Sequence, residues 1–442
     1  MGTYITVIQG DLIDKNIPPT NLPQNSIVEL PGKFKGRSQG IKITENILSK
    51  HSMLIGGTGS GKTNLFYHFI AQIRNRMTNN DAMIVFDSKG DFFKRFYRQG
   101  DIVLSNSKKY NGYSTYWNIY KEIVVDGWEN SDVFSNANEI THSFFKEAIT
   151  NSSQPFFPSA ARDLMTSLLI AHIRLGQDDL EFKKRFFNNK ALRQYFDMLT
   201  PQKIKKLLSA SVFSDLSSTL SYIGDGSSDQ ALGVLAELQN VVRQILFGTF
   251  AEDGRFSVRE FVRNKGAKVL FVEYDLSVGE TLTPIYRLLF DLALKEAMGR
   301  NKSEGNVYLM CDEFKLLPNL QHIEDGVNFG RSLGVKIIAG IQSIEQLYEI
   351  YGESKGRNIA AGFSSVYAFK ANDSHTREYI TNLYGKNIVL EQYKSANNVL
   401  VEDKRNGNVV EDWDLNNLEI GEAIVGLPFE KPFKFNFDLF RG

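Results

Sequence analysis

The segment GGTGSGKT at Gly56–Thr63 constrains the fold of this chain more than any other feature, because it matches the phosphate-binding pattern G-x-x-x-x-G-K-[ST] in full. The short apolar run Met53–Ile55 precedes it, and apolar residues recur at helical spacing from Leu65 to Ile73 after it. This order predicts a buried strand, a glycine-rich loop and a helix, so that backbone N–H groups and the positive end of the helix dipole face phosphate oxygens. The segment therefore predicts an α/β domain that binds a nucleoside triphosphate.

Two side chains of this loop have separate expected roles. Lys62 is expected to reach the β- and γ-phosphates, and Thr63 to hold Mg²⁺. The glycines allow the backbone to approach the phosphates closely. ATP and Mg²⁺ are therefore the predicted ligands. The loop residues predicted to bind the nucleotide are Gly56, Gly57, Thr58, Gly59, Ser60, Gly61, Lys62 and Thr63.

The composition limits the remaining classes of protein. The 442 residues include 51 basic and 51 acidic side chains. This balance argues against a protein that binds nucleic acid over a uniformly basic surface, but it permits a local basic surface that lines a nucleic-acid site. The single cysteine, Cys311, excludes an internal disulfide and a zinc ribbon. No apolar run approaches the ~20 residues of a membrane helix, and the first residues lack a signal-peptide pattern. We therefore expect a cytoplasmic protein without a membrane segment of its own.

The pattern of the sequence changes twice along the chain. Short apolar runs, typical of buried parallel strands, alternate with helical patterns in the first part and again from Ala267. Between these parts, runs such as AARDLMTSLLIAHI and DQALGVLAELQNVVRQILF have helical periodicity only. The sequence predicts a β-rich lead-in at 1–45, a nucleotide-binding domain made of 46–125 and 247–442, and an inserted all-α domain at 126–246.

A second acidic element is expected at the end of a strand that neighbours the phosphate-binding loop. The largely apolar run Val307–Cys311 is followed directly by Asp312 and Glu313. Asp312 is expected to bind the nucleotide and its Mg²⁺, and Glu313 to orient and deprotonate the attacking water. An acidic helix cap after a strand would give the same local pattern, but the upstream loop favours catalytic carboxylates.

Two more candidates depend on position alone. The predicted strand Val335–Ile341 ends at Gln342, whose amide could contact the γ-phosphate or the attacking water, or could only cap the strand. Arg331 lies on the element before that strand and could reach the nucleotide of a neighbouring subunit. A solvated surface arginine is the simpler interpretation of Arg331 from its position alone.

Further patterns have weaker implications. Asp87 follows a predicted strand and could support the Mg²⁺ site without binding the metal directly. Basic and aromatic residues mix from Lys89 to Asp101, which suits single-stranded nucleic acid, but an amphipathic helix with buried aromatic rings is the favoured interpretation. The basic clusters Lys183–Lys190 and Lys203–Lys206 in the helical segment are most simply solvated faces.

Several longer stretches complete the pattern. They are DSKGD, FFPSAARDLMTSLL, FSVREFV, GETLTPIYRLLFDLALKEA, CDEFKLLPNL, GRSLGVKIIAGIQSIEQLYEIYG and AFKANDSHTREYITNLYG. Together with GGTGSGKT they resemble the type IV coupling proteins of conjugation and secretion systems, which belong to the wider FtsK/HerA group of hexameric DNA-pumping ATPases. The resemblance covers roughly residues 40–435, and the combination of DEF, LLP, GR, IQS and a following YG is specific.

The resemblance implies a RecA-like P-loop NTPase domain interrupted by an all-α domain, in ring hexamers that pass DNA or protein–DNA complexes through a central channel. It also implies that Arg331 is an arginine finger acting across a subunit boundary and that Gln342 is a sensor amide. At the position of Lys50, family members can have another basic residue at that boundary. They typically begin with transmembrane helices, which this sequence does not show, so recruitment by a membrane partner or a changed role is expected.

The leading functional hypothesis is an ATP-hydrolysing DNA translocase. One alternative is a nucleotide-gated adaptor that recruits substrates to a secretion channel and uses the all-α domain for docking. Another is a HerA-like motor subunit of an antiphage defence complex. The expected partners are DNA, further copies of the chain in a homo-hexamer, and a relaxase, a secretion channel or an effector protein. Stimulation of hydrolysis by DNA separates the motor from the adaptor.

Overall fold

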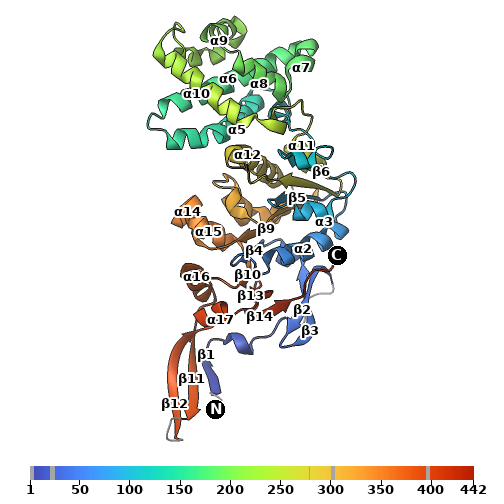
Figure 1. Ribbon diagram of the computed structural model, residues 1–442, viewed down its shortest axis with the longest axis vertical. Helices are drawn as coiled ribbons and strands as arrows, with labels where there is room; N and C mark the ends of the chain where they lie inside the picture. The colour runs from blue at the N-terminus through green and yellow to red at the C-terminus, as the bar shows by residue number, and fades with distance from the viewer. Residues whose placement is uncertain (1–3, 20–24, 278, 300–303, 395–398) are drawn as a thin grey trace. The chain divides into compact units, whose positions relative to one another are not determined.

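The computed structural model describes residues 4–19, 25–277, 279–299, 304–394 and 399–442 (Figure 1). Contacts within the chain divide it into two compact units. The first unit consists of Met1–Gln99, Gly266–Val269 and Ala297–Gly442, and the second consists of Gly100–Lys265 and Leu270–Glu296. The first unit is therefore assembled from segments that are far apart in the sequence.

The first unit contains a sheet with a parallel centre. Its parallel strands lie in the order β10 (Ser365–Phe369), β4 (Ser52–Ile55), β9 (Val335–Ile341), β8 (Val307–Cys311) and β5 (Ala82–Asp87). Every residue of these strands is buried, which explains why they are mostly continuous apolar runs in the sequence. Beyond β10 the sheet continues with antiparallel strands, which are β13 (Glu422–Gly426), β14 (Phe433–Phe437), β2 (Ser26–Phe34) and β3 (Arg37–Thr44).

The predicted lead-in is therefore not separate from the nucleotide-binding unit, because β2 and β3 extend the same sheet. Its first strand, β1 (Tyr4–Gln9), pairs instead with β11 (Lys386–Lys394), and β11 pairs with β12 (Leu400–Asn408) in a second small sheet (Figure 1). Long-range pairing of this kind has no local signal in the sequence.

The helices of the first unit connect these strands. The helix after the phosphate-binding loop, α2, buries the apolar face that the sequence predicts and contacts β2. In α3 the rings of Phe92 and Phe96 are buried. This agrees with the favoured interpretation of the basic and aromatic stretch as an amphipathic helix with aromatic rings in the core. The α-helices are α1 (Glu45–Leu48), α2 (Lys62–Arg76), α3 (Asp91–Phe96), α13 (Ile323–Phe329), α14 (Glu345–Tyr351), α15 (Glu353–Gly362), α16 (Ser374–Tyr384) and α17 (Asp412–Asn416).

The second unit is mostly helical. It also contains one pair of parallel strands, formed by β6 (Ile102–Ser105) and the C-terminal part of β7 (Lys268–Glu273). Residues 126–246, all of which are described, contain no strand, and Figure 1 draws this part in green as helices. The helices are α4 (Ile119–Ile123), α5 (Asn130–Asn151), α6 (Phe156–Asp178), α7 (Leu180–Phe186), α8 (Asn189–Asp197), α9 (Pro201–Leu208), the 3-10 helix η3 (Ser211–Tyr222), α10 (Asp229–Ile245), α11 (Val258–Asn264) and α12 (Gly279–Met298).

Helix α6 is the centre of this helical domain. It contacts α5, α7, α9, η3 and α10, and most of its residues from Ala160 to Ile173 are buried. A helix that is apolar on most of its faces has to be surrounded by other helices. Among the described residues, no helix combines the length and apolar character needed to cross a membrane.

The buried carboxylate of Glu122 joins the two ends of the helical insertion. It accepts hydrogen bonds from Trp117 Nε1 at 2.9 Å, from Ser257 Oγ at 2.8 Å and from the Val258 backbone N–H at 2.6 Å. Burial raises the pKa of Glu122, and these hydrogen bonds oppose that shift. Trp117 precedes the insertion and Ser257 follows it. The Glu122 side chain therefore holds together the two segments that lead into and out of the helical insertion.

Replacing Glu122 with alanine is expected to lower the free energy of unfolding by ~3 kcal/mol, because it leaves several buried donors without an acceptor. The matched control is Glu260→Ala, which removes a half-exposed ion pair with Lys121 and should cost less than ~1 kcal/mol. Urea unfolding followed by tryptophan fluorescence measures both. Equal effects of the two substitutions would contradict the structural role of Glu122.

Candidate functional site

The phosphate-binding loop connects β4 to α2 and is fixed to the neighbouring strands. The backbone N–H of Gly56 donates to Ile341 O at 3.2 Å, and that of Gly57 donates to Lys370 O at 2.8 Å. Gly61 has a φ of +117°, which a residue with a side chain rarely adopts. The ends of β9 and β10 therefore anchor the start of the loop, and Gly61 allows the backbone conformation with which the loop enters α2.

Lys62 and Ser60 give the loop the chemistry of an anion site. The Lys62 ammonium is buried and donates to the carbonyl oxygens of Gly56 and Gly57, the second at 3.1 Å. Burial lowers the pKa of Lys62, and the nearby carboxylates of Asp312 and Glu313 raise it. The Ser60 hydroxyl is buried and has no hydrogen-bond partner among the described residues. A buried cation and an unpaired hydroxyl in a glycine-rich loop fit phosphate oxygens.

Thr63 and Asp312 form the predicted metal-binding pair. The Thr63 hydroxyl donates to Asp312 Oδ2 at 2.7 Å, although the two residues are 249 positions apart. Burial raises the pKa of Asp312, and the hydrogen bond from Thr63 lowers it. A hydroxyl and a buried carboxylate are oxygen ligands of the kind that Mg²⁺ prefers, with phosphates and water completing its shell. The residues present therefore fit Mg²⁺ bound together with a nucleotide.

Glu313 lies beside Asp312 and is oriented by two polar side chains. Gln342 Nε2 donates to Glu313 Oε2 at 3.2 Å and to Oε1 at 3.4 Å. The Lys89 ammonium is 3.8 Å from Glu313 Oε1. A carboxylate held in this way at the edge of a phosphate site can accept a proton from a water molecule.

The prediction that the acidic strand lies next to the phosphate-binding strand is wrong. Strand β9 lies between β4 and β8 and pairs with both. Gln342 therefore extends from the strand between the loop and the acids, which explains its contact with Glu313. Gly340 on β9 allows the backbone of Asp312 to lie close to this strand, because a Cβ at position 340 would be 2.3 Å from the Asp312 carbonyl oxygen. The order of parallel strands is set by long connections, so local sequence patterns do not reveal it.

Asp87 and Lys89 have roles that the sequence did not assign. Asp87 Oδ1 accepts the backbone N–H groups of Lys89 at 3.1 Å and Gly90 at 2.8 Å, and Oδ2 accepts those of Phe92 at 2.8 Å and Phe93 at 3.1 Å in the first turn of α3. Asp87 therefore shapes the loop that places the Lys89 ammonium beside Glu313. An aspartate three residues before a glycine is the available signal for such a loop, but the contact with Glu313 depends on the tertiary structure.

Arg331 and Lys50 lie together in a different place. The guanidinium of Arg331 donates to Asn46 Oδ1 at 3.1 Å. Both cations line a hollow of about 430 Å³, whose described lining includes neither a carboxylate nor a residue of the phosphate-binding loop. The Lys50 ammonium is 3.8 Å from the ring centroid of Phe429, a residue that is 94% exposed. Burial and the charge of Arg331 lower the pKa of Lys50.

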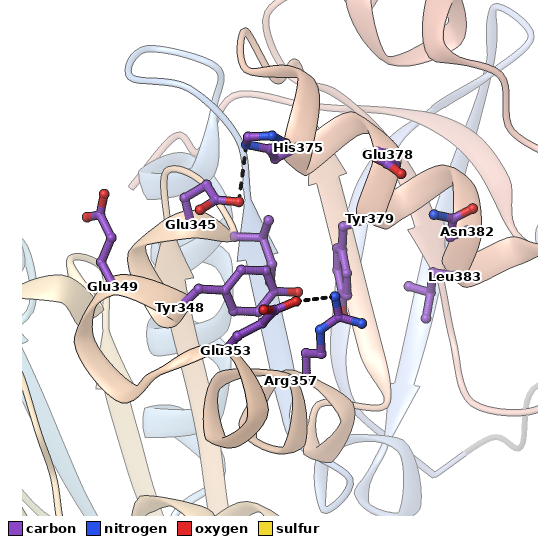
Figure 2. A pocket seen from close by; sticks show the side chains of 11 residues that line it. Glu345, Tyr348, Glu349, Glu353, Arg357, His375, Glu378, Tyr379, Asn382 and Leu383 are labelled. Carbon is purple, nitrogen blue, oxygen red and sulfur yellow. Dashed lines mark hydrogen bonds and ion pairs between the residues drawn. The ribbon is translucent and has the colours of Figure 1, made fainter.

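Helices α14, α15 and α16 enclose another hollow, of about 660 Å³, which Figure 2 shows. Two of its carboxylates are paired within it, Glu353 with Arg357 at 2.5 Å and Glu345 with His375 Nδ1 at 3.2 Å (Figure 2). Its lining residues come after Gln342 in the chain and include none of the predicted site residues. The hollow therefore shares no residue with the predicted phosphate site.

The loop, the Thr63–Asp312 pair and the Glu313–Gln342 contact define the chain as a RecA-like P-loop NTPase. Residues 37–427 match the family model described as the type IV secretion-system coupling protein DNA-binding domain. Because this match covers most of the chain, the protein belongs to that family.

Individual relatives agree with this assignment. Coupling protein TraD of Escherichia coli (strain K12) is 22% identical over an alignment of 377 residues, and the alignment covers 82% of this chain and 48% of TraD. The chain thus spans about half the length of this curated relative.

Solved structures show the same fold. The unbound monoclinic form of the bacterial conjugative coupling protein TrwBdeltaN70 is 20% identical and has a TM-score of 0.72. The superposition covers 91% of this chain and 88% of TrwBdeltaN70. TrwB in complex with the non-hydrolysable ATP analogue ADPNP is 17% identical with a TM-score of 0.72, and 99% of this chain covers 95% of it. The predicted fold class, a RecA-like domain with an inserted all-α domain, is confirmed.

Two substitutions in the site should separate nucleotide binding from hydrolysis. Lys62→Ala is expected to weaken binding of a fluorescent ATP analogue at least ~10-fold, because it removes charge-assisted hydrogen bonds to phosphate. Glu313→Gln should keep affinity within a few-fold and lower the rate of phosphate release by ~10²–10⁴, because an amide does not accept the proton. Turnover near that of the unmodified chain in Glu313→Gln would show that the base lies elsewhere.

Proposed function

We propose that the chain is an ATP-hydrolysing DNA translocase, the motor of a type IV coupling system. The observation that supports this most strongly is that Lys62, Thr63, Asp312 and Glu313 meet at the C-terminal ends of the central parallel strands. TrwB, which shares the fold, has been solved with ADPNP and with ADP and Mg²⁺. These complexes support ATP and Mg²⁺ as the ligands of this chain.

In this proposal each side chain has one task. Lys62 neutralises the β- and γ-phosphates, and Thr63 and Asp312 hold Mg²⁺, which supplies further positive charge there. Glu313 accepts the proton of the attacking water, while the Gln342 amide and the Lys89 ammonium fix the direction of its carboxylate. Phosphoryl transfer depends mainly on positioning and charge, and the contacts among these residues serve both.

Arg331 and Lys50 act on the nucleotide of a neighbouring copy. Their hollow contains two cations without a carboxylate in its described lining, so it attracts an anion. The separation of this hollow from the phosphate-binding loop of the same chain supports action across a subunit boundary. A homo-hexamer, in which each copy supplies Arg331 to the next, is the assembly we propose.

DNA is the proposed substrate of the motor, supported by the description of the family as a DNA-binding domain. The proposed motor comprises residues 46–125 and 247–442 together with β2 and β3, which extend its sheet, and the all-α domain is 126–246. A relaxase, a secretion channel or an effector protein is the further partner, and we propose recruitment to the inner face of the membrane through such a partner.

Steady-state phosphate release with and without DNA tests this function. A motor should hydrolyse ATP several-fold faster with single- or double-stranded DNA, and the Glu313→Gln variant should show no such increase. The comparison is made at a protein concentration where association is verified by mass measurement. Rates that neither form of DNA changes would contradict the motor and favour a nucleotide-gated adaptor.

A further inference from the structure

The helical domain contains an apolar hollow at its surface. It has a volume of about 550 Å³ and is formed by α6, α7, α8, α9 and the start of η3. This volume lies within the range of sites that bury a ligand. None of its lining residues belongs to the phosphate site, so binding to the hollow can be tested separately from ATP hydrolysis.

Aromatic and aliphatic side chains make up most of its wall. Phe182 and Phe186 of α7 stack obliquely with ring centroids 4.6 Å apart, and both rings remain partly exposed. The ring centroids of Tyr195 and His172 are 4.3 Å apart, and the side chain of Val212 at the edge of the hollow is 62% exposed. Partly exposed aromatic residues around a concave apolar surface are typical of protein interfaces.

The polar groups of the wall do not offer negative charge. Burial lowers the pKa of His172 to about 4, so the imidazole is neutral at pH 7, and its Nδ1 lies 2.9 Å from the Tyr120 hydroxyl. Lys203 and Lys206 are the charged residues in the described lining, and both are exposed on α9. A partner therefore meets an apolar floor with ammonium groups at its edge.

The surrounding sequence is strongly basic. Residues 172–213, which include the whole described lining, contain nine lysines and arginines and four acids, a net charge of +5, although the whole chain has a formal net charge of zero. Two of the acids, Glu181 and Asp197, already pair with Lys184 and Arg193. The basic clusters that the sequence suggested as solvated faces thus surround an apolar hollow.

We propose that this hollow binds an amphipathic helix of a partner protein, with an apolar face that enters the hollow and acidic residues along its edges. Large apolar side chains one helical turn apart would contact Phe182, Phe186 and Val212, in the way that helices occupy grooves. Carboxylates beside them would pair with Lys203 and Lys206. Bases of single-stranded nucleic acid stack on exposed rings beside basic residues. The aliphatic part of the wall, which is Leu175, Leu207 and Val212, instead favours apolar side chains of a helix, and the oligonucleotide probe below separates the two occupants.

A designed peptide tests this site directly. The probe is a fluorescein-labelled helix of roughly 18 residues, or five turns, with leucine at positions i, i+3, i+4 and i+7 and glutamate at the flanking positions. The comparison probes are the same peptide with lysine in place of each glutamate, and a single-stranded oligonucleotide. Fluorescence anisotropy with the full chain measures binding of each probe.

The acidic peptide should bind, and the lysine peptide at least ~10-fold more weakly. Val212→Glu, which places a charge at the exposed edge of the hollow, should weaken binding of the acidic peptide ~10-fold or more. The double variant Lys203→Glu and Lys206→Glu should reverse the preference between the two peptides. The matched control is Lys205→Glu, on the same helix but outside the hollow, which should change affinity less than ~3-fold.

Three results would overturn the proposal. The first is no binding of the acidic peptide, and the second is equal binding of both peptides. The third is binding of the oligonucleotide that Val212→Glu abolishes, which would assign the hollow to nucleic acid. All variants should keep the thermal transition and the ATP hydrolysis rate of the unmodified chain, so lost peptide binding with both retained reports the hollow itself.

Discussion

The hydrogen bond from the Thr63 hydroxyl to the Asp312 carboxylate depends on the whole central sheet being assembled. Thr63 stands at the start of α2 and Asp312 at the end of β8, and β9 separates β4 from β8. The 2.7 Å contact forms because β9 carries Gly340, whose missing side chain leaves room for the Asp312 backbone. The same arrangement places Gln342 against Glu313. The proposed metal ligands, proton acceptor and orienting amide thus depend on the same position of β9 in the sheet.

Local patterns predicted the parts of the site, and the tertiary structure determined how they meet. The phosphate-binding loop and the Asp312–Glu313 pair were found because each follows a buried strand within a short stretch of sequence. The position of β9 between their strands, and with it the contact of Gln342 with Glu313, could not be found in this way. Lys89 was missed for the same reason, since its partner, Glu313, follows β8 more than two hundred residues later in the chain. The pairing of β1 with β11 is a further case.

The residues proposed to act in hydrolysis lie in two places. Those proposed to bind phosphate and water surround one loop, whereas Arg331 and Lys50 lie together beside the exposed ring of Phe429. Two cations so close repel each other, and the lowered pKa of Lys50 reflects both burial and this repulsion. A phosphate from another copy would relieve that repulsion. In the proposed assembly, hydrolysis is coupled to association by charge, because Arg331 of one copy adds a cation to the nucleotide site of the next.

Activity in a mixture of two inactive variants tests that shared site most directly. Lys62→Ala retains Arg331 but lacks a working phosphate site, and Arg331→Ala retains the phosphate site but lacks the arginine, a loss worth on the order of 10³–10⁵ in turnover when a finger acts in trans. The measurement is ATP hydrolysis by each variant alone and by their mixture, with co-assembly verified by mass. A mixture that clearly exceeds the sum of its components is the predicted result. A co-assembled mixture that equals that sum would contradict a nucleotide site shared between copies.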